Sequence, residues 1–144
     1  MAFTTSREII ASPASVFAAF VDSARLAGWW GPSGFTNTFH TCEFRPGGVW
    51  SYVMHGPNGM DYPNESIFRT IEPNRRIVIE HVSKPRYVLT IDLEPTDGGG
   101  TRVRWEQAFE SDKVARAIEH IVVPANEQNL DRLTAEVLRG EAGG

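Results

Sequence analysis

Residues 111–139, SDKVARAIEHIVVPANEQNLDRLTAEVLR, decide the fold. Their apolar side chains recur at the spacing of one face of a long helix. That face comprises Ala115, Ile118, Val122, Ala125, Leu130, Leu133 and Val137. The helical period of about 3.6 residues also places Asn126 and Asn129 on this face, where a plain core would have leucine. The sequence therefore predicts a long amphipathic helix that carries two amides on its buried side.

Pro124 interrupts this closing segment. Proline removes one backbone hydrogen bond and clashes with the preceding turn, so we expect a kink or a break near Val123. A break there would turn Asn126 and Asn129 off the buried face. At the other end of the segment, Ser111 or Asp112 is predicted to cap the helix.

The beginning of the chain reads as one strand followed by two short helices. Residues 3–10 are predicted to form the strand. Ser12 and Pro13 are typical of a helix start. The Ser12 hydroxyl can accept a hydrogen bond from a free backbone N–H group, and proline at the first helical position removes no helical hydrogen bond. A second helix over residues 24–29 is predicted to be capped by Ser23.

From Phe35 onward the hydrophobic pattern changes to period two, which is typical of strands. The predicted strands are residues 35–45, 49–55, 62–71, 75–82, 87–93 and 101–109. Strands joined by such short connections must be antiparallel, and a sheet with one apolar face needs a cover. The sequence thus predicts an α+β fold in which a curved antiparallel sheet of about seven strands surrounds the closing helix and leaves a space between them.

Composition narrows the class of protein. A chain of 144 residues with 41% hydrophobic residues is the size of one compact domain, spanning residues 1–144. The net charge of −4, without blocks of like charge, gives no reason to expect nucleic acid or a membrane as partner. There is no apolar run long enough to span a bilayer, no signal-peptide pattern and a single cysteine, Cys42, so we expect a cytoplasmic protein.

Several motifs together resemble one known family. They are residues 29–36 (WWGPSGFT), 45–48 (RPGG), 72–73 (EP) before 76–77 (RI), and 126–133 (NEQNLDRL). In this order they are similar to the activator of heat-shock-protein-90 ATPase homologue family, within the START-like, birch-pollen-allergen-like (SRPBCC) superfamily. The resemblance covers about residues 7–138. It implies a helix-grip fold with a deep cavity between sheet and closing helix, usually a site for hydrophobic small molecules.

Strand parity places two sets of three residues each on a single face of the predicted sheet. The sets are His40, Cys42 and Phe44, and Trp50, Tyr52 and Met54. Alignment of the RPGG turn with the family suggests that both sets face inward. Core packing is one interpretation of these side chains, since aromatic and sulfur groups fill cores routinely. Ligand contact is the other, because buried hydroxyl, imidazole and amide groups each need a hydrogen-bond partner.

The predicted ligand-binding residues combine these strand positions with the inner face of the closing helix. They are Trp30, His40, Cys42, Trp50, Tyr52, Met54, Phe68, Trp105, Val122, Asn126, Asn129 and Leu133. Trp29 and Trp30 are adjacent and cannot point the same way, so we expect one to pack inward and the other to lie nearer the cavity mouth.

Catalytic and metal motifs are missing from the sequence. His40 and Cys42 have the spacing of one metal-ligand pair, but a second pair is lacking, so we predict no metal site. No nucleophile elbow occurs, and we predict no catalytic residue and no cofactor. Acid–base chemistry remains an alternative, in which His40, His55 or Glu65 acts from an apolar cavity with a shifted pKa.

Three functions remain open at this point. The first is binding of a small hydrophobic molecule in the cavity, without catalysis. The second is an enzyme of the cyclase or hydrolase kind that uses the same cavity. The third is a module that modulates a chaperone ATPase or contacts another protein. Edge strands of the predicted sheet would also permit a homodimer.

Overall fold

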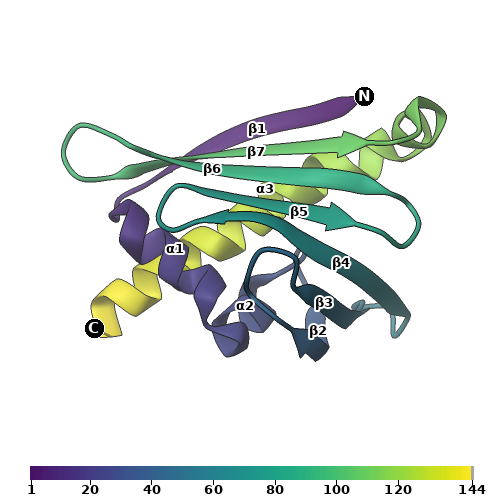
Figure 1. The fold of residues 1–144 in the computed structure, drawn as a ribbon, viewed down its shortest axis with the longest axis horizontal. Coiled ribbons are helices and arrows are strands. Elements are labelled where there is room, and N and C mark those ends of the chain that lie inside the picture. The colour runs from purple at the N-terminus through teal and green to yellow at the C-terminus, as the bar shows by residue number, and fades with distance from the viewer. Residues whose placement is uncertain (144) are drawn as a thin grey trace.

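The computed structural model describes residues 1–143, in which three helices and seven strands follow one another in the predicted order (Figure 1). The elements are β1 Ala2–Ile9, α1 Pro13–Val21, α2 Ser23–Trp29, β2 Thr36–Cys42, β3 Val49–His55, β4 Asp61–Glu72, β5 Arg76–His81, β6 Tyr87–Pro95, β7 Thr101–Phe109 and α3 Asp112–Gly143. This arrangement confirms the predicted α+β class.

The strands form one sheet in the order β1-β7-β6-β5-β4-β3-β2, and every neighbouring pair is antiparallel. The long helix α3 runs across one face of this sheet, where it contacts β1 and β7 (Figure 1). Helices α1 and α2 pack against α3 and also against the sheet. A curved antiparallel sheet that holds a long helix in this way is the helix-grip fold.

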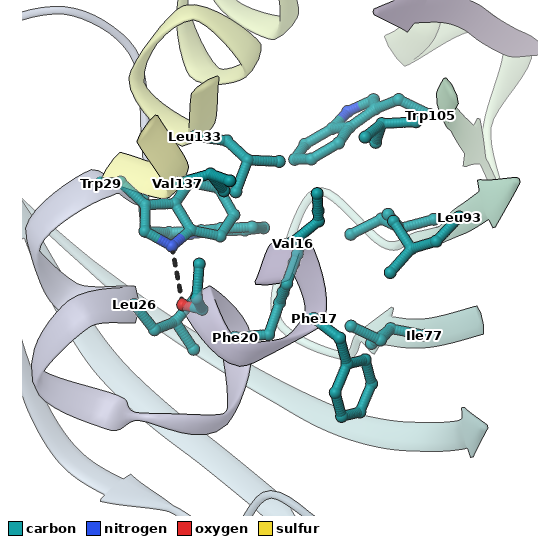
Figure 2. Close-up of a cluster of buried hydrophobic side chains, with 14 of the residues drawn as sticks. Val16, Phe17, Phe20, Leu26, Trp29, Ile77, Leu93, Trp105, Leu133 and Val137 are labelled. Carbon is teal, nitrogen blue, oxygen red and sulfur yellow. Dashed lines mark hydrogen bonds between the residues drawn. The ribbon is translucent and has the colours of Figure 1, made fainter. Parts of the chain in front are cut away.

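The core lies between the inner face of the sheet and the three helices, and Figure 2 shows its central cluster. On β7 the predicted alternation is observed, because Val103, Trp105 and Phe109 are buried while the residues between them are not. Removal of such apolar surface from water is the main driving force for this packing. All four tryptophans are buried, each at most 5% exposed, so their rings fill much of the space between sheet and helix.

The two short helices begin at side-chain caps. Ser12 caps α1, as predicted. The predicted cap of α2 is wrong by one residue, because Asp22 rather than Ser23 takes this role. The Asp22 Oδ1 atom accepts hydrogen bonds from the backbone N–H groups of Ala24 (2.9 Å) and Arg25 (3.3 Å). A carboxylate also interacts more favourably than a hydroxyl with the positive end of the helix dipole.

Helix α3 continues through Pro124, so of the expected kink or break the break is wrong. The ring removes the partner of the carbonyl four residues earlier, on His120. Both Pro124 and His120 are exposed, so water can satisfy this carbonyl. The helix begins after Ser111, whose hydroxyl accepts a hydrogen bond from the Val114 N–H at 3.2 Å, which confirms one of the two predicted caps. Its uninterrupted course keeps Asn126 on the inner face.

Strand β2 is shorter than predicted and contains a bulge. Its pairing with β3 shifts between Phe39 and Thr41, so His40 is the extra residue. Because of the bulge, the residues before His40 point to the opposite face of the sheet from the one that simple alternation predicts. Phe39 therefore points inward, with its ring 5.7 Å from that of Tyr52, and His40 is exposed. The prediction that His40 faces inward is wrong, whereas Cys42, beyond the bulge, packs against the core.

Candidate ligand-binding site

A cavity of about 90 Å³ lies between the sheet and α3. Its lining comprises Trp30, Gly31 and Pro32 after α2, Tyr52 and Met54 of β3, Tyr87 and Leu89 of β6, Trp105 and Gln107 of β7, and Ala125, Asn126 and Asn129 of α3. Pockets for drug-sized ligands measure about 300–1,000 Å³. The space expected from the resemblance is therefore present but small, because aromatic side chains occupy much of it.

The structure brings six of the predicted site residues together around this cavity. They are Trp30, Tyr52, Met54, Trp105, Asn126 and Asn129. The other six do not line it. Trp50, Phe68 and Leu133 are fully buried in the surrounding core. Cys42 and Val122 are half-buried away from it, and His40 is exposed on the β2 bulge.

Other lining residues were not predicted. They are Gly31, Pro32, Tyr87, Leu89, Gln107 and Ala125. The alternation of β7 is a signal that would have found Gln107, because it places this amide on the same face as Trp105. Tyr87 and Leu89 share the inner face of β6 by the same parity, although nothing in the sequence sets them apart from ordinary core residues.

Of the two adjacent tryptophans, Trp30 lines the cavity and Trp29 packs into the core. The Trp30 Nε1–H group donates to the Tyr52 hydroxyl at 3.2 Å. The Asn129 amide donates to the Trp29 carbonyl at 3.2 Å and so connects α3 to the end of α2. The Asn126 amide donates to a side-chain oxygen on β7 at 3.1 Å. Several polar groups of the lining residues therefore have hydrogen-bond partners within the protein.

One fully buried polar atom of the described lining residues has no such partner. The Nε1–H group of Trp105 is buried and forms no hydrogen bond within residues 1–143; the same is true of Trp50, which lies outside the lining. An indole nitrogen can only donate, and a buried donor without a partner costs about 1–3 kcal/mol. Trp105 therefore lines the cavity with its ring and carries a covered donor that an acceptor would stabilise.

Among the residues 1–143 that the structure describes, those that line the cavity carry no carboxylate, imidazole, guanidinium or ammonium group. Its titratable groups are the hydroxyls of Tyr52 and Tyr87, and burial raises the pKa of both above the ordinary tyrosine value. Both hydroxyls are therefore neutral at pH 7. Outside the lining, burial raises the pKa of the Cys42 thiol to about 11, so this thiol stays protonated. The lining can thus offer hydrogen bonds, but no group that exchanges a proton near neutral pH.

Behind the cavity wall lies His81, which is 2% exposed and stacks on Tyr87 with ring centroids 4.4 Å apart. Its Nδ1 atom lies 2.7 Å from the Pro85 carbonyl oxygen, and its Nε2 atom lies 2.7 Å from Asn64 Oδ1. Burial lowers the pKa of His81, and hydrogen bonds to the backbone oppose this effect only in part. The lowered pKa favours the neutral ring, which has one N–H and so donates to only one of these two oxygens; with Nδ1–H donating to Pro85, Nε2 can accept from the Ser83 hydroxyl at 3.3 Å.

This buried histidine makes stability depend on pH. In the window below the ordinary histidine pKa of about 6.5, the unfolded chain protonates at His81 before the folded protein does, so stability falls as pH decreases. We expect the melting temperature to fall less steeply between pH 7 and pH 5 in His81→Gln than in the wild-type protein. The matched control is His120→Gln, since His120 is exposed. If the melting temperatures of His81→Gln and the wild-type protein fell equally steeply between pH 7 and pH 5, this role of His81 would be contradicted.

Arg132 of α3 holds the chain segment that forms one wall of the cavity. Its guanidinium group donates to the carbonyl oxygens of Gly28 (2.8 Å), Trp30 (3.1 Å), Gly31 (2.9 Å), Pro32 (2.8 Å) and Phe35 (3.0 Å). The carbonyls at a helix C-terminus lack partners and carry partial negative charge, so a cation is favoured there. Burial lowers the pKa of Arg132. Arg132 lies in the 126–133 motif, but sequence analysis predicted no role for its side chain.

The curved sheet, the long helix and the cavity between them define a helix-grip protein of the START-like class. Residues 10–137 match the family described as activator of Hsp90 ATPase homolog 1-like protein. Because this match covers most of the chain, the protein belongs to that family, as the motifs predicted. No curated protein matches the chain.

Solved structures share the fold over nearly the whole length. A protein from Arthrobacter aurescens is 26% identical with a TM-score of 0.86, and the match covers 96% of this chain and 86% of that one. A protein from Nitrosomonas europaea is 19% identical with a TM-score of 0.88, and the match covers 99% of this chain and 97% of that one. An AHSA1 protein from Silicibacter pomeroyi is 20% identical with a TM-score of 0.76, and the match covers 97% of this chain and 99% of that one.

The family and the fold fit a ligand-binding or protein-interaction module. Across residues 1–143, none of the helices combines the length and the apolar character needed to cross a membrane.

Proposed function

We propose that this protein binds a compact, largely apolar molecule with one hydrogen-bond acceptor in the cavity between the sheet and α3. The observation that carries the proposal is the buried, unpartnered Nε1–H group of Trp105, which belongs to a lining that is otherwise mostly aromatic and aliphatic. A carbonyl or ether oxygen on the ligand would satisfy this donor once the side chains that cover the Trp105 Nε1–H group shift, and the surrounding ring faces would supply the apolar contact.

The volume of the cavity limits the size of the ligand. An apolar cavity of about 150 Å³ is large enough to bind benzene. At about 90 Å³, the present cavity is smaller than that, so a short chain fits as the cavity stands and a molecule with one ring requires lining side chains to move. Met54 is half-buried among the lining residues, and its flexible thioether can move to admit a slightly larger group.

The chemistry of the lining favours binding over catalysis. An acid–base enzyme would need a group whose pKa lies near the working pH within reach of the ligand. The groups that titrate in this lining are two tyrosines whose pKa values burial raises further from neutrality. His40, one of the residues considered for acid–base chemistry, is exposed on the β2 bulge and lies outside the lining.

Replacement of Ala125 by phenylalanine tests the location of the site. Ala125 is a half-buried lining residue of α3, so a larger side chain there would occupy the cavity. We expect Ala125→Phe to weaken the binding of acetophenone by about tenfold or more, measured by quenching of tryptophan fluorescence. Three other tryptophan rings lie within 6.0 Å of the Trp30 ring, so the signal reports on this region.

Ala117→Phe is the matched control, because Ala117 is exposed on the same helix. It should bind acetophenone as the wild type does. Equal affinities of the two variants would show that acetophenone binds elsewhere, and absence of any wild-type response at millimolar acetophenone would remove the support for this ligand class.

A second candidate function is contact with another protein, as the family description suggests. Three apolar side chains of α3 favour it, since Val114, Ile121 and Val123 are 38%, 58% and 44% exposed. If α3 contacts an Hsp90 chaperone, the wild-type protein should raise the chaperone ATPase rate and Ile121→Asp should not. An unchanged ATPase rate with wild-type protein would exclude this function.

A further inference from the structure

A second hollow of about 500 Å³ lies between the β5–β6 loop and the start of α3. Both of these segments lie at the end of the molecule on the right in Figure 1. Its walls include Lys84, Pro85 and Arg86 from the loop, and Phe109 and Val114 from the other side. We call this hollow the end groove. It shares no lining residue with the internal cavity.

The end groove and the internal cavity are neighbours, separated by two aromatic rings. Tyr87 lines the cavity, Phe109 lines the end groove, and the centroids of these rings are 5.3 Å apart. Their proximity means that ligand binding at the two places must be distinguished by experiment.

The end groove carries two basic side chains and one acidic side chain. Lys84 and Arg86 are exposed, and neither forms an ion pair with any residue of the described chain. Glu110 is the carboxylate of this lining, so two cations face one anion and the formal charge is +1. Glu80 lies in the adjoining hollow, where Arg69 lowers its pKa by a hydrogen bond and Arg86 adds a smaller effect. This local positive charge contrasts with the net charge of −4 of the whole chain.

The rest of the end groove is mainly apolar. The Pro85 ring, the Phe109 ring and the Val114 side chain all contribute to it, and Val114 is 38% exposed. Apolar side chains beside unpaired cations match a molecule that has an anionic head and a hydrocarbon tail. Water released from these surfaces would favour the tail, and the two cations would favour the head.

We propose that the end groove binds a single-chain carboxylate, with its head near Lys84 and Arg86 and its alkyl chain along Phe109 and Val114. A free amphiphile fits the observations better than a membrane surface. Membrane attraction by charge typically needs clusters of about 4–8 basic residues, whereas this groove has two beside an acidic residue. Its concave shape also suits one chain rather than a flat bilayer.

Calorimetric titration with decanoate, compared with 1-decanol, tests the proposal. In the double variant Lys84→Glu/Arg86→Glu, decanoate affinity should fall by about tenfold or more while decanol affinity changes by less than about twofold. Added salt should weaken only decanoate binding. Val114→Asp should weaken the binding of both decanoate and 1-decanol, because it places a charge beside the alkyl chain. Lys113→Glu is the matched control, since Lys113 is exposed on the same helix turn and lies outside the lining.

Ala125→Phe separates this inference from the proposed function of the internal cavity. It should leave decanoate affinity unchanged, and loss of decanoate binding in this variant would place the chain in the cavity and overturn the end-groove proposal. Equal loss in Lys113→Glu and in the double variant would also overturn it. So would the absence of wild-type binding at millimolar decanoate, or cosedimentation with phosphatidylglycerol vesicles without binding of free decanoate.

Discussion

Replacing Arg132 by methionine is expected to lower the free energy of unfolding by about 3 kcal/mol or more, since hydrogen bonds that involve a charged group contribute about 1.5–3 kcal/mol each. Five backbone carbonyls accept hydrogen bonds from this one guanidinium group. Methionine keeps much of the aliphatic stem but cannot donate. Several carbonyls at the end of α2 would then lose their partner at once.

Urea unfolding of wild type, Arg132→Met and Arg116→Met measures this effect. Arg116 is exposed on the same helix and its loss should change stability by less than about 0.5 kcal/mol. Arg132→Lys should recover only part of the loss, because an ammonium group is a point charge rather than a planar fork. A stability loss below about 1 kcal/mol in Arg132→Met would contradict the view that Arg132 holds the cavity wall.

Truncation of Trp29 to alanine is expected to cost about 4 kcal/mol, within the range for large aromatic residues in a core. Trp29 is 1% exposed, and its ring packs edge-on against Phe20 with centroids 4.9 Å apart. Its Nε1–H group also donates to the Ala19 carbonyl at 2.9 Å, the dashed bond in Figure 2. The side chain therefore connects α2 to α1 by both packing and hydrogen bonding.

Trp29→Phe separates these two contributions. It keeps an aromatic ring beside Phe20 but leaves the Ala19 carbonyl without its partner, so we expect a loss of about 1–2 kcal/mol, clearly smaller than for alanine. Thermal and urea unfolding of the two variants provide the comparison. Similar small losses in Trp29→Ala and Trp29→Phe would show that the ring is not packed as Figure 2 shows.

The fold was predictable from the sequence because its main signals are local and periodic. Alternation over β7 and the helical period of α3 each depend on residues close together in the chain. The face of β2 was not predictable, because the bulge at His40 shifts the parity without any change in the hydrophobic pattern. Neither was the uninterrupted course of α3, since proline costs less where the freed carbonyl can reach water.

The candidate site was predictable only in part, for a physical reason. Parity and the family motifs indicated residues such as Tyr52 and Trp105, which do line the cavity. The contacts of Arg132 join residues about 100 positions apart, and no local pattern encodes them. The volume of the cavity depends on how four tryptophan rings pack together, which composition alone does not specify.

The most direct test of acceptor binding in the cavity is the ¹H–¹⁵N NMR spectrum of the four indole N–H groups during titration with acetophenone. Trp105→Phe identifies the Trp105 signal by its disappearance. We expect the ketone to shift the Trp105 Nε1–H resonance downfield in the wild type and in Ala117→Phe, but not in Ala125→Phe. An unchanged Trp105 indole resonance at saturating acetophenone, or the same shift in Ala125→Phe, would contradict the proposed site.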